Sequence, residues 1–253
     1  MSYDLQKASM LKRVSAYIFD FILLITLAVG VAALLSGMLG YDSRTAQRQE
    51  LRAEYETRYG VTFDIAPEEY DALTDEQRTL YDQAYADFAN DTEVNRLDVM
   101  IINLTLLILV FSLLVPFLLL ECLVPLLFGH GRTLGKKIFN VGVMRVDGVR
   151  LSTFQLFVRT VLGKYTLETM IPLFLALLLV FNILPLACLT GLALLFLLQA
   201  AFLLTSPMRT PIHDMIAGTV TVDFASQLIF DSPAELLSYK EKLHAEMVQR
   251  ATY

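Results

Sequence analysis

The sequence has little of the side-chain chemistry from which disulfide frameworks and metal clusters are built. It holds two cysteines and three histidines among 253 residues. Cys122 and Cys188 each lie inside a long apolar stretch, where a thiol behaves as a small hydrophobic group. These counts and positions argue against a disulfide framework, and they predict neither a metal site nor a bound cofactor.

The sequence also lacks the common motifs of enzymes. The loop GHGRTLGKK invites comparison with the phosphate-binding pattern G-x-x-x-x-G-K-[ST]. With Gly135 and Lys136 as its GK pair, that pattern requires glycine at position 130 and serine or threonine at 137, where the chain has His130 and Lys137. No nucleophile elbow and no zinc-protease helix occurs either. We therefore predict that the protein is not an enzyme, and we expect no nucleic-acid partner.

Charge is nearly absent from three long stretches, which are Phe21–Leu39, Val99–Phe128 and Leu167–Thr205. A membrane-spanning helix needs about 20 mostly apolar residues. The first two stretches each fit one helix, while the third, with 39 residues, fits two. The mean hydropathy of the whole chain is +0.54. We predict an all-α membrane protein with about four transmembrane helices.

The first two predicted spans run from about Val14 to Leu39 and from Val99 to Phe128. The third stretch is predicted to form a hairpin with a break near Asn182–Pro185. Its first helix is short, about Met170–Phe181, and its second covers about Leu184–Leu204. A single kinked helix is the alternative, and it would place the C-terminus on the opposite side of the membrane.

Charged residues are distributed unevenly around these spans. Residues 41–98 hold 15 acidic residues and six arginines, whereas residues 129–166 hold seven basic residues and one aspartate. Because cytoplasmic loops are enriched in lysine and arginine, the 129–166 loop and the N-terminus are predicted to lie in the cytoplasm. The acidic segment is then outside. We expect a multi-pass protein of the bacterial cytoplasmic membrane with both termini in the cytoplasm.

The acidic segment 41–98 is predicted to be an extracytoplasmic helical insertion. It contains eight aromatic residues, and several of them recur at helical spacing. The sequence TDEQ at Thr74–Gln77 is typical of a helix start, with the threonine and glutamine capping each other. A solvated cap is the simpler interpretation, and a surface that binds a partner protein or cations is the alternative.

Two further polar segments complete the single membrane domain expected over residues 1–253. In the cytoplasmic loop 129–166, Asp147-Gly148 between β-forming residues predicts a short β-hairpin. The capping pattern of Ser152 and Gln155 then begins an amphipathic helix that is expected to lie in the membrane interface. Residues 224–253 are predicted to form a charged cytoplasmic surface helix.

Two carboxylates lie at membrane depth, where ionisable groups are costly and persist when they have a partner or a function. Asp20 lies seven residues past Arg13, and Glu121 lies seven residues before Phe128, so both are roughly 10 Å deep from the cytoplasmic side. Together they could form a proton or cation site, with Arg13 on the same helix face as Asp20. The structural alternative is an ion-pair network in which Arg13, Arg132 or Arg159 neutralises the carboxylates.

Two other groups of residues could carry a function. His213 and Asp214 are adjacent at the inner interface, and a histidine can titrate near neutral pH. A helix cap by Asp214, or an ion pair between it and an arginine of the loop, is the simpler interpretation. The basic loop with Arg132, Lys136 and Lys137 is suited to anionic lipid headgroups or to a partner.

Four segments of the chain follow one another in the order LKRVSAYIFDFILL, GRTLGKKIFNVGVMRVDGVRLS, LFVRTVL and RTPIHDMIAGTVTVD. Together they resemble the RDD family of bacterial and archaeal membrane proteins. The family name refers to one arginine and two aspartates, to which Arg13, Asp20 and Asp214 correspond. The long acidic insertion between the first two helices departs from the commonest form of the family. The resemblance implies a transport role, since some members are associated with sodium/proton antiport.

The first functional hypothesis is a transporter of small cations in exchange for protons. Asp20 and Glu121 would carry the exchange, supported by Arg13, Arg159, His213 and Asp214. Because one copy is small for alternating access, we expect a homo-oligomer. A non-transporting scaffold or accessory subunit that binds a partner protein is the second hypothesis, and a lipid-binding membrane protein is the third. Membrane lipids are expected partners in every case.

Overall fold

The computed structural model describes residues 4–251, with side chains described as far as residue 249. The described chain divides into two compact units. One unit comprises the residues up to 28 together with those from 113 onward, and the other comprises residues 29–112. The first unit contains the small sheet, and the second contains the acidic insertion.

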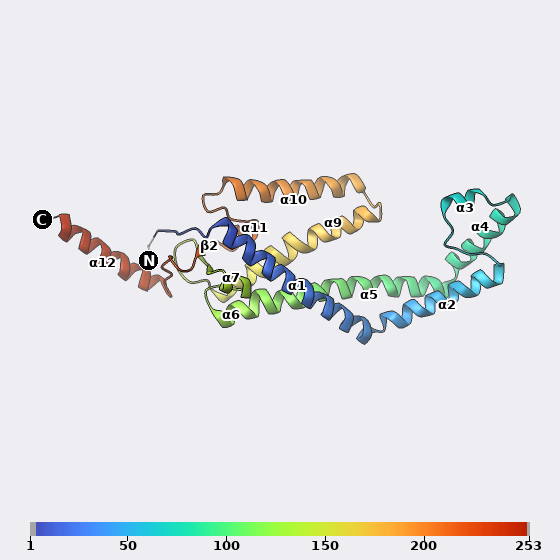
Figure 1. Ribbon diagram of the computed structural model, residues 1–253, viewed down its shortest axis with the longest axis horizontal. Coiled ribbons are helices and arrows are strands. Elements are labelled where there is room, and N and C mark those ends of the chain that lie inside the picture. Colours follow the sequence, from blue (N-terminus) through green and yellow to red (C-terminus); the bar gives the residue numbers. More distant parts are fainter. Residues whose placement is uncertain (1–3, 252–253) are drawn as a thin grey trace. The chain divides into compact units, whose positions relative to one another are not determined.

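The described chain is mostly helical, and four of its helices are long and apolar enough to cross a membrane. This confirms the predicted fold class. Two of the four are composite, because a π-helical segment joins their α-helical parts without a break (Figure 1). The elements are α1 (Met10–Leu39); α5 (Thr92–Phe117), η1 (Leu118–Leu123) and α6 (Val124–Phe128); α8 (Thr153–Phe157), η2 (Val158–Met170) and α9 (Ile171–Val180); and α10 (Pro185–Thr205).

The predicted hairpin in the third apolar stretch is confirmed. The chain turns through left-handed residues Asn182 and Leu184, with φ of 55° and 48°, and Pro185 begins α10. Helices α9 and α10 then lie side by side (Figure 1). Proline suits the first turn of a helix because its missing N–H would have no partner there.

The first helix of that hairpin is much longer than predicted. The capping pair of Ser152 and Gln155 is present, but the helix that it begins continues to Val180 instead of forming a separate interfacial helix. Charged side chains made the segment resemble a surface helix. In the structure Arg159 and Lys164 each have a buried or half-buried carboxylate partner, which lets one helix continue through this region.

The π-helical segments shift the hydrogen-bonding pattern from i−4 to i−5. The amide of Val124 donates to the carbonyl of Leu119, and the amide of Ile171 donates to the carbonyl of Thr166. Such segments occur frequently at functional sites because they change which side chains share a helix face. Here η1 carries Glu121, and η2 carries three charged residues.

A two-stranded antiparallel sheet is formed by β1 (Val141–Arg145) and β2 (Thr219–Asp223). The predicted turn at Asp147-Gly148 is present, since the amide of Gly148 donates to the carbonyl of Arg145. The return chain, however, makes only an isolated bridge between Arg150 and Met144. The ladder partner of β1 is β2, because Met144, Val220 and Val222 form a small buried core.

The acidic insertion is helical, as predicted. It comprises α2 (Tyr41–Tyr59), α3 (Pro67–Asp71) and α4 (Asp75–Asn90), and it has a core of five buried residues. The predicted reciprocal cap of Thr74 and Gln77 begins α4. The core residues are Tyr55, Phe63, Ala84, Phe88 and Val94.

Three short or terminal helices complete the chain. Helix α7 (Leu134–Ile138) precedes β1, and α11 (Ile212–Ile216) precedes β2. The predicted C-terminal helix is α12 (Pro233–Ala251). Its Leu236 packs with Val149 and Phe230 in another small buried cluster.

Candidate functional site

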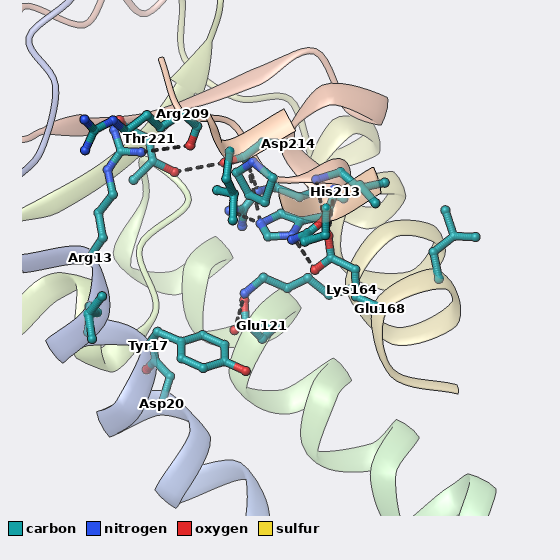
Figure 2. A pocket seen from close by; sticks show the side chains of 18 of the residues that line it. Arg13, Tyr17, Asp20, Glu121, Lys164, Glu168, Arg209, His213, Asp214 and Thr221 are labelled. Carbon is teal, nitrogen blue, oxygen red and sulfur yellow. Dashed lines mark hydrogen bonds and ion pairs between the residues drawn. The ribbon is translucent and has the colours of Figure 1, made fainter. Parts of the chain in front are cut away.

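A cavity of about 630 Å³ lies among the helices of the first unit. Its wall is mostly apolar and includes Leu192, Leu195 and Phe196 of α10. Its charged side chains come from α1, η1, α7, η2, α11 and the chain that precedes α11 (Figure 2). They are Arg13, Asp20, Glu121, Lys136, Arg159, Lys164, Glu168, Arg209 and Asp214.

Glu121 is held between two lysines. Lys164 of η2 donates to its Oε1 atom at 2.6 Å, and Lys136 of α7 lies 4.0 Å from its Oε2 atom. The hydroxyl of Thr160 donates to the backbone carbonyl of Glu121 and thereby joins η1 to η2. Lysines therefore neutralise Glu121, whereas the structural alternative had named arginines as the partners of the carboxylates.

Two polar atoms of this group are buried and have no hydrogen-bond partner in the part of the chain that the structure describes. They are Oε2 of Glu121 and Nζ of Lys136, whose residues are 6% and 9% exposed. Buried polar groups in native proteins are almost always hydrogen-bonded, so each exception requires an explanation. The pKa of Lys136 is lowered to about 7, first by its burial and then by the nearby cations Arg159 and Lys164.

Asp20 does not form its hydrogen bonds with Glu121. Its Oδ2 atom accepts from the hydroxyl of Thr133 at 2.5 Å, and its Oδ1 atom accepts from the amide of Gly135 at 2.8 Å. Thr133 also caps α7 by accepting from the amide of Lys136. Asp20 thus attaches the start of α7 to α1, and this attachment sets the position of Lys136.

Glycine is required where α7 meets α1. A β-carbon on Gly135 would lie 3.0 Å from the carboxylate of Asp20 and would collide with the backbone carbonyl of Ala16. A second close approach joins α11 to η2, because a β-carbon on Gly163 would lie 2.5 Å from the β-carbon of His213. Both glycines lie in helices, so close packing rather than backbone freedom accounts for them.

Arg159 and Asp214 form a fully buried ion pair. The guanidinium Nε atom lies 2.6 Å from Oδ1 of Asp214, and the two side chains are 2% and 1% exposed. Asp214 also accepts from the hydroxyls of Thr219 and Thr221 on β2. Burial alone would raise the pKa of Asp214, but the charge of Arg159, the neighbouring His213 and the hydrogen bonds from Arg159 and Thr219 together hold it well below its usual range. The structure therefore agrees with the simpler interpretation of Asp214, in which it forms an ion pair with an arginine of the loop.

His213 is neutral, with its proton on Nδ1. Its Nε2 atom lies 3.1 Å from Nη2 of Arg159, and its Nδ1 atom lies 2.7 Å from Oε2 of Glu168. Since a guanidinium can only donate, Nε2 must accept, and Nδ1 must carry the hydrogen that the carboxylate accepts. Burial lowers the pKa of His213, and the neighbouring Arg159 lowers it further.

Arg13 does not pair with a predicted carboxylate. Its guanidinium donates to the backbone carbonyls of Thr221 at 2.7 Å, Met208 at 3.1 Å and Arg209 at 3.3 Å. These bonds attach α1 to β2 and to the chain that follows α10. Arg13 therefore positions the elements around the cavity, which differs from the controlling charge expected beside Asp20.

The predicted basic patch is not a single exposed surface. Lys136 is buried in the cavity, as described above. Arg132 lies over the ring of Phe224, 3.9 Å from its centroid, and Lys137 lies over the ring of Phe128 at 3.7 Å. A lipid contact through Arg132 or Lys137 stays a prediction, whereas Lys136 does not reach the surface that this contact requires.

Sequence reasoning missed three residues that complete the site. Lys164 was placed on the polar face of a surface helix, and Glu168 and Thr133 were not considered. A signal was present in the spacing of the charged residues Arg159, Lys164 and Glu168, which is five and then four residues. That spacing suits a helix with i−5 hydrogen bonds, and the hydroxyl of Thr169, which donates to the carbonyl of Lys164, follows the same step.

Comparison with curated proteins and with solved structures found no match. The family model described as RDD family matches residues 7–218. This range contains Arg13, Asp20 and Asp214, whose side chains line the cavity described above. The match extends over most of the chain and includes all four long apolar helices. The chain therefore belongs to the RDD family of membrane proteins.

Proposed function

We propose that this protein exchanges protons for a small monovalent cation across a membrane, and that both ions are held in the cavity beside Glu121. The observation that carries the proposal is the Oε2 atom of Glu121, which is buried at the cavity wall and has no hydrogen-bond partner within residues 4–249. A carboxylate oxygen in this position suits a proton or a cation. Ionisable groups inside a membrane protein are costly, and they mark ion pathways when they persist.

We infer different roles for the two carboxylates named from the sequence. Lys164 holds only one oxygen of Glu121 and leaves the other free to bind an ion. Asp20 has both oxygens occupied by the start of α7, so its role is to position that helix. The ammonium of Lys136 lies 4.0 Å from the free oxygen, and its side chain has to move aside when another cation binds there.

The proposal includes the membrane orientation. Both termini and the loop 129–166 would lie in the bacterial cytoplasm, with the acidic insertion outside, in agreement with the enrichment of basic residues in cytoplasmic loops. A homo-oligomer would be the transporting form, because transporters of this kind usually contain repeated halves that move against each other.

Ion flux in sealed proteoliposomes tests the proposal. A pH-sensitive dye inside the vesicles reports proton movement when Na⁺, Li⁺ or K⁺ is added outside. We expect cation-dependent proton movement in the wild type and its loss in Glu121→Gln. The matched control is Glu241→Gln, which changes an exposed glutamate of α12 and should leave the flux unchanged. Absence of flux in folded wild-type protein with all three cations would refute the proposal.

A second candidate function is the binding of a partner protein by the insertion. The observation in its favour is that the insertion has a core of its own, with Phe63 packed against Tyr81, Tyr85 and Phe88. Phe63→Ala should loosen this core without changing the cavity. If transport is the function, the flux survives this substitution, whereas loss of a copurifying protein would favour partner binding.

A further inference from the structure

A second cavity lies where two of the membrane helices end. Its volume is about 370 Å³, and its residues belong to the end of α6, the loop that follows and the start of α8. Helix α6 ends at Phe128, and the long helix that includes α8 begins at Thr153. Because these are the ends of two candidate spans, the cavity lies at the level of the lipid headgroups rather than among the acyl chains.

We propose that this cavity binds the phosphate of an anionic phospholipid headgroup, with Arg150 as the residue that recognises it. The site is separate from the ion cavity, since none of its lining residues is shared with that cavity. The proposed transport function could fail without affecting it.

The guanidinium of Arg150 is available to a ligand. Its Nη2 atom lies across Gly129, 3.3 Å from the place that a β-carbon on this glycine would occupy. Its ion-pair partner is Asp231 at 3.8 Å, and the Asp231 side chain is 74% exposed, so the pair is weak and easily exchanged. Arginine suits phosphate because its planar donors match the phosphate oxygens in pairs.

The backbone holds Arg150 in place before any ligand arrives. Its amide donates to the carbonyl of Phe230 at 2.8 Å, and its strand bridges to Met144 of β1. A preformed position reduces the entropy that the site loses on binding.

The facing loop is also held in one conformation. Gly129, His130 and Gly131 all have positive φ angles, of 70°, 52° and 60°. A β-carbon on Gly131 would lie 3.0 Å from atoms of Leu151 and Val143, so the loop is packed closely onto β1. The unusual conformation of His130, a residue with a side chain, indicates that the surrounding structure imposes it.

An unpartnered polar atom completes the site. The Nδ1 atom of His130 is buried and has no hydrogen-bond partner among the described residues. Arg150 and Arg132 both lie close enough to His130 to lower its pKa, after the larger effect of burial. A phosphate in the cavity would lie beside Arg150 and His130, where it would accept hydrogen bonds. It would also offset the positive charge that Arg150 and Arg132 bring to His130, which Asp231 opposes.

The apolar part of the cavity identifies a lipid as the source of the phosphate. Pro125, Leu126, Leu151 and Leu156 are among its lining residues, and Leu126 is 47% exposed on a membrane helix. Polar residues that include Arg150 and Ser152 line the same cavity. A diacyl phospholipid combines the same two chemistries, with acyl chains for the exposed apolar helix surface and a phosphate for Arg150.

The experiment compares lipid binding by the purified full-length chain in detergent. Phosphatidylglycerol, phosphatidylcholine and inorganic phosphate are the three probes, and native mass spectrometry with thermal melting gives the number of bound lipids and the affinity. We expect saturable binding of phosphatidylglycerol that is weakened about tenfold in Arg150→Gln, as a lost charge-assisted hydrogen bond predicts. Arg150→Lys, which keeps the charge and the fold, should weaken it less.

The matched control is Arg145→Gln, on the other side of the same turn, where the arginine pairs with Asp147. It should change the affinity by less than about twofold. If Arg145→Gln and Arg150→Gln weaken lipid binding equally, binding depends on the general surface charge, and the proposal is overturned. Unchanged binding in both Arg150 variants would also overturn it. If inorganic phosphate stabilises the protein through Arg150 and no lipid binds, the ligand is a soluble phosphate, and the proposal of a lipid headgroup is overturned.

Discussion

Arg159 and Asp214 lie 2.6 Å apart in a site where neither side chain is more than 2% exposed. They come from positions 55 residues apart in the chain, and their pairing attaches α11 to η2. Asp214 is the residue that the sequence comparison predicted to be the second aspartate of the family name, and its partner is the arginine of the segment LFVRTVL. The two residues form a tertiary ion pair at the wall of the cavity.

Breaking this pair should destabilise the protein strongly. In Asp214→Asn the guanidinium of Arg159 stays buried without a counter-charge, so we expect the free energy of unfolding to fall by about 3–5 kcal/mol. Chemical denaturation in detergent micelles, followed by circular dichroism, measures the change. The exposed pair of Arg145 and Asp147 is the control, since Asp147→Asn should cost less than about 1 kcal/mol. If both variants lower the free energy of unfolding by similar amounts, burial of the Arg159–Asp214 pair does not account for the loss.

Stability should decrease on mild acidification because of His213. Its pKa in the folded protein is lowered, so the unfolded chain binds more protons between that pKa and the ordinary value near 6.5. The stabilisation that comes from keeping His213 neutral is therefore fully present above about pH 6.5. It is lost as the pH falls below this value, and the free energy of unfolding decreases by up to about 1.4 kcal/mol per pH unit. Melting temperatures between pH 5 and 7.5 measure this slope.

The variant His213→Asn tests the assignment, since the asparagine amide can donate to Glu168 without taking up a proton. It should flatten the slope even if it lowers the stability at pH 7.5. The same substitution at the exposed His244 of α12 is the control. A slope that persists in His213→Asn would assign the acid sensitivity to another group.

Gly163→Ala should destabilise the protein although alanine favours helices. The added β-carbon would lie 2.5 Å from the β-carbon of His213 and 2.8 Å from its α-carbon, so α11 has to move away from η2. Overpacking costs about 1–3 kcal/mol, and the gain in helix propensity offsets about 1 kcal/mol of it, so we expect a net loss of up to about 2 kcal/mol. Thermal unfolding measures it. Gly30→Ala is the matched control, because no atom lies within 4 Å of its added β-carbon, and it should be neutral or stabilising.

The membrane helices and their caps could be predicted because their signals are local. A span requires an apolar stretch of sufficient length, and this criterion located all four helices and the turn at Asn182. The caps at Thr74 and Ser152 depend on residues three positions apart, and both are present.

The pairing of β1 with β2 could not be predicted in the same way. The turn at Asp147-Gly148 favoured the nearby chain as the partner of β1, and this expectation was wrong for the ladder. The better partner lies more than 70 residues further along the chain, where Val220 and Val222 complete a core with Met144. Burial of these apolar side chains decided the pairing, and no local pattern records it.

The sequence by itself determined that this protein crosses a membrane, that its polar insertion is helical and that it belongs to the RDD family, because hydropathy, capping and motif order are properties of neighbouring residues. Tertiary structure alone decided which charges meet. Glu121 pairs with Lys164, Asp20 binds the start of α7, and Arg159 pairs with Asp214. Each charge must find a partner when it leaves water, and packing of distant helices determines which partner it finds.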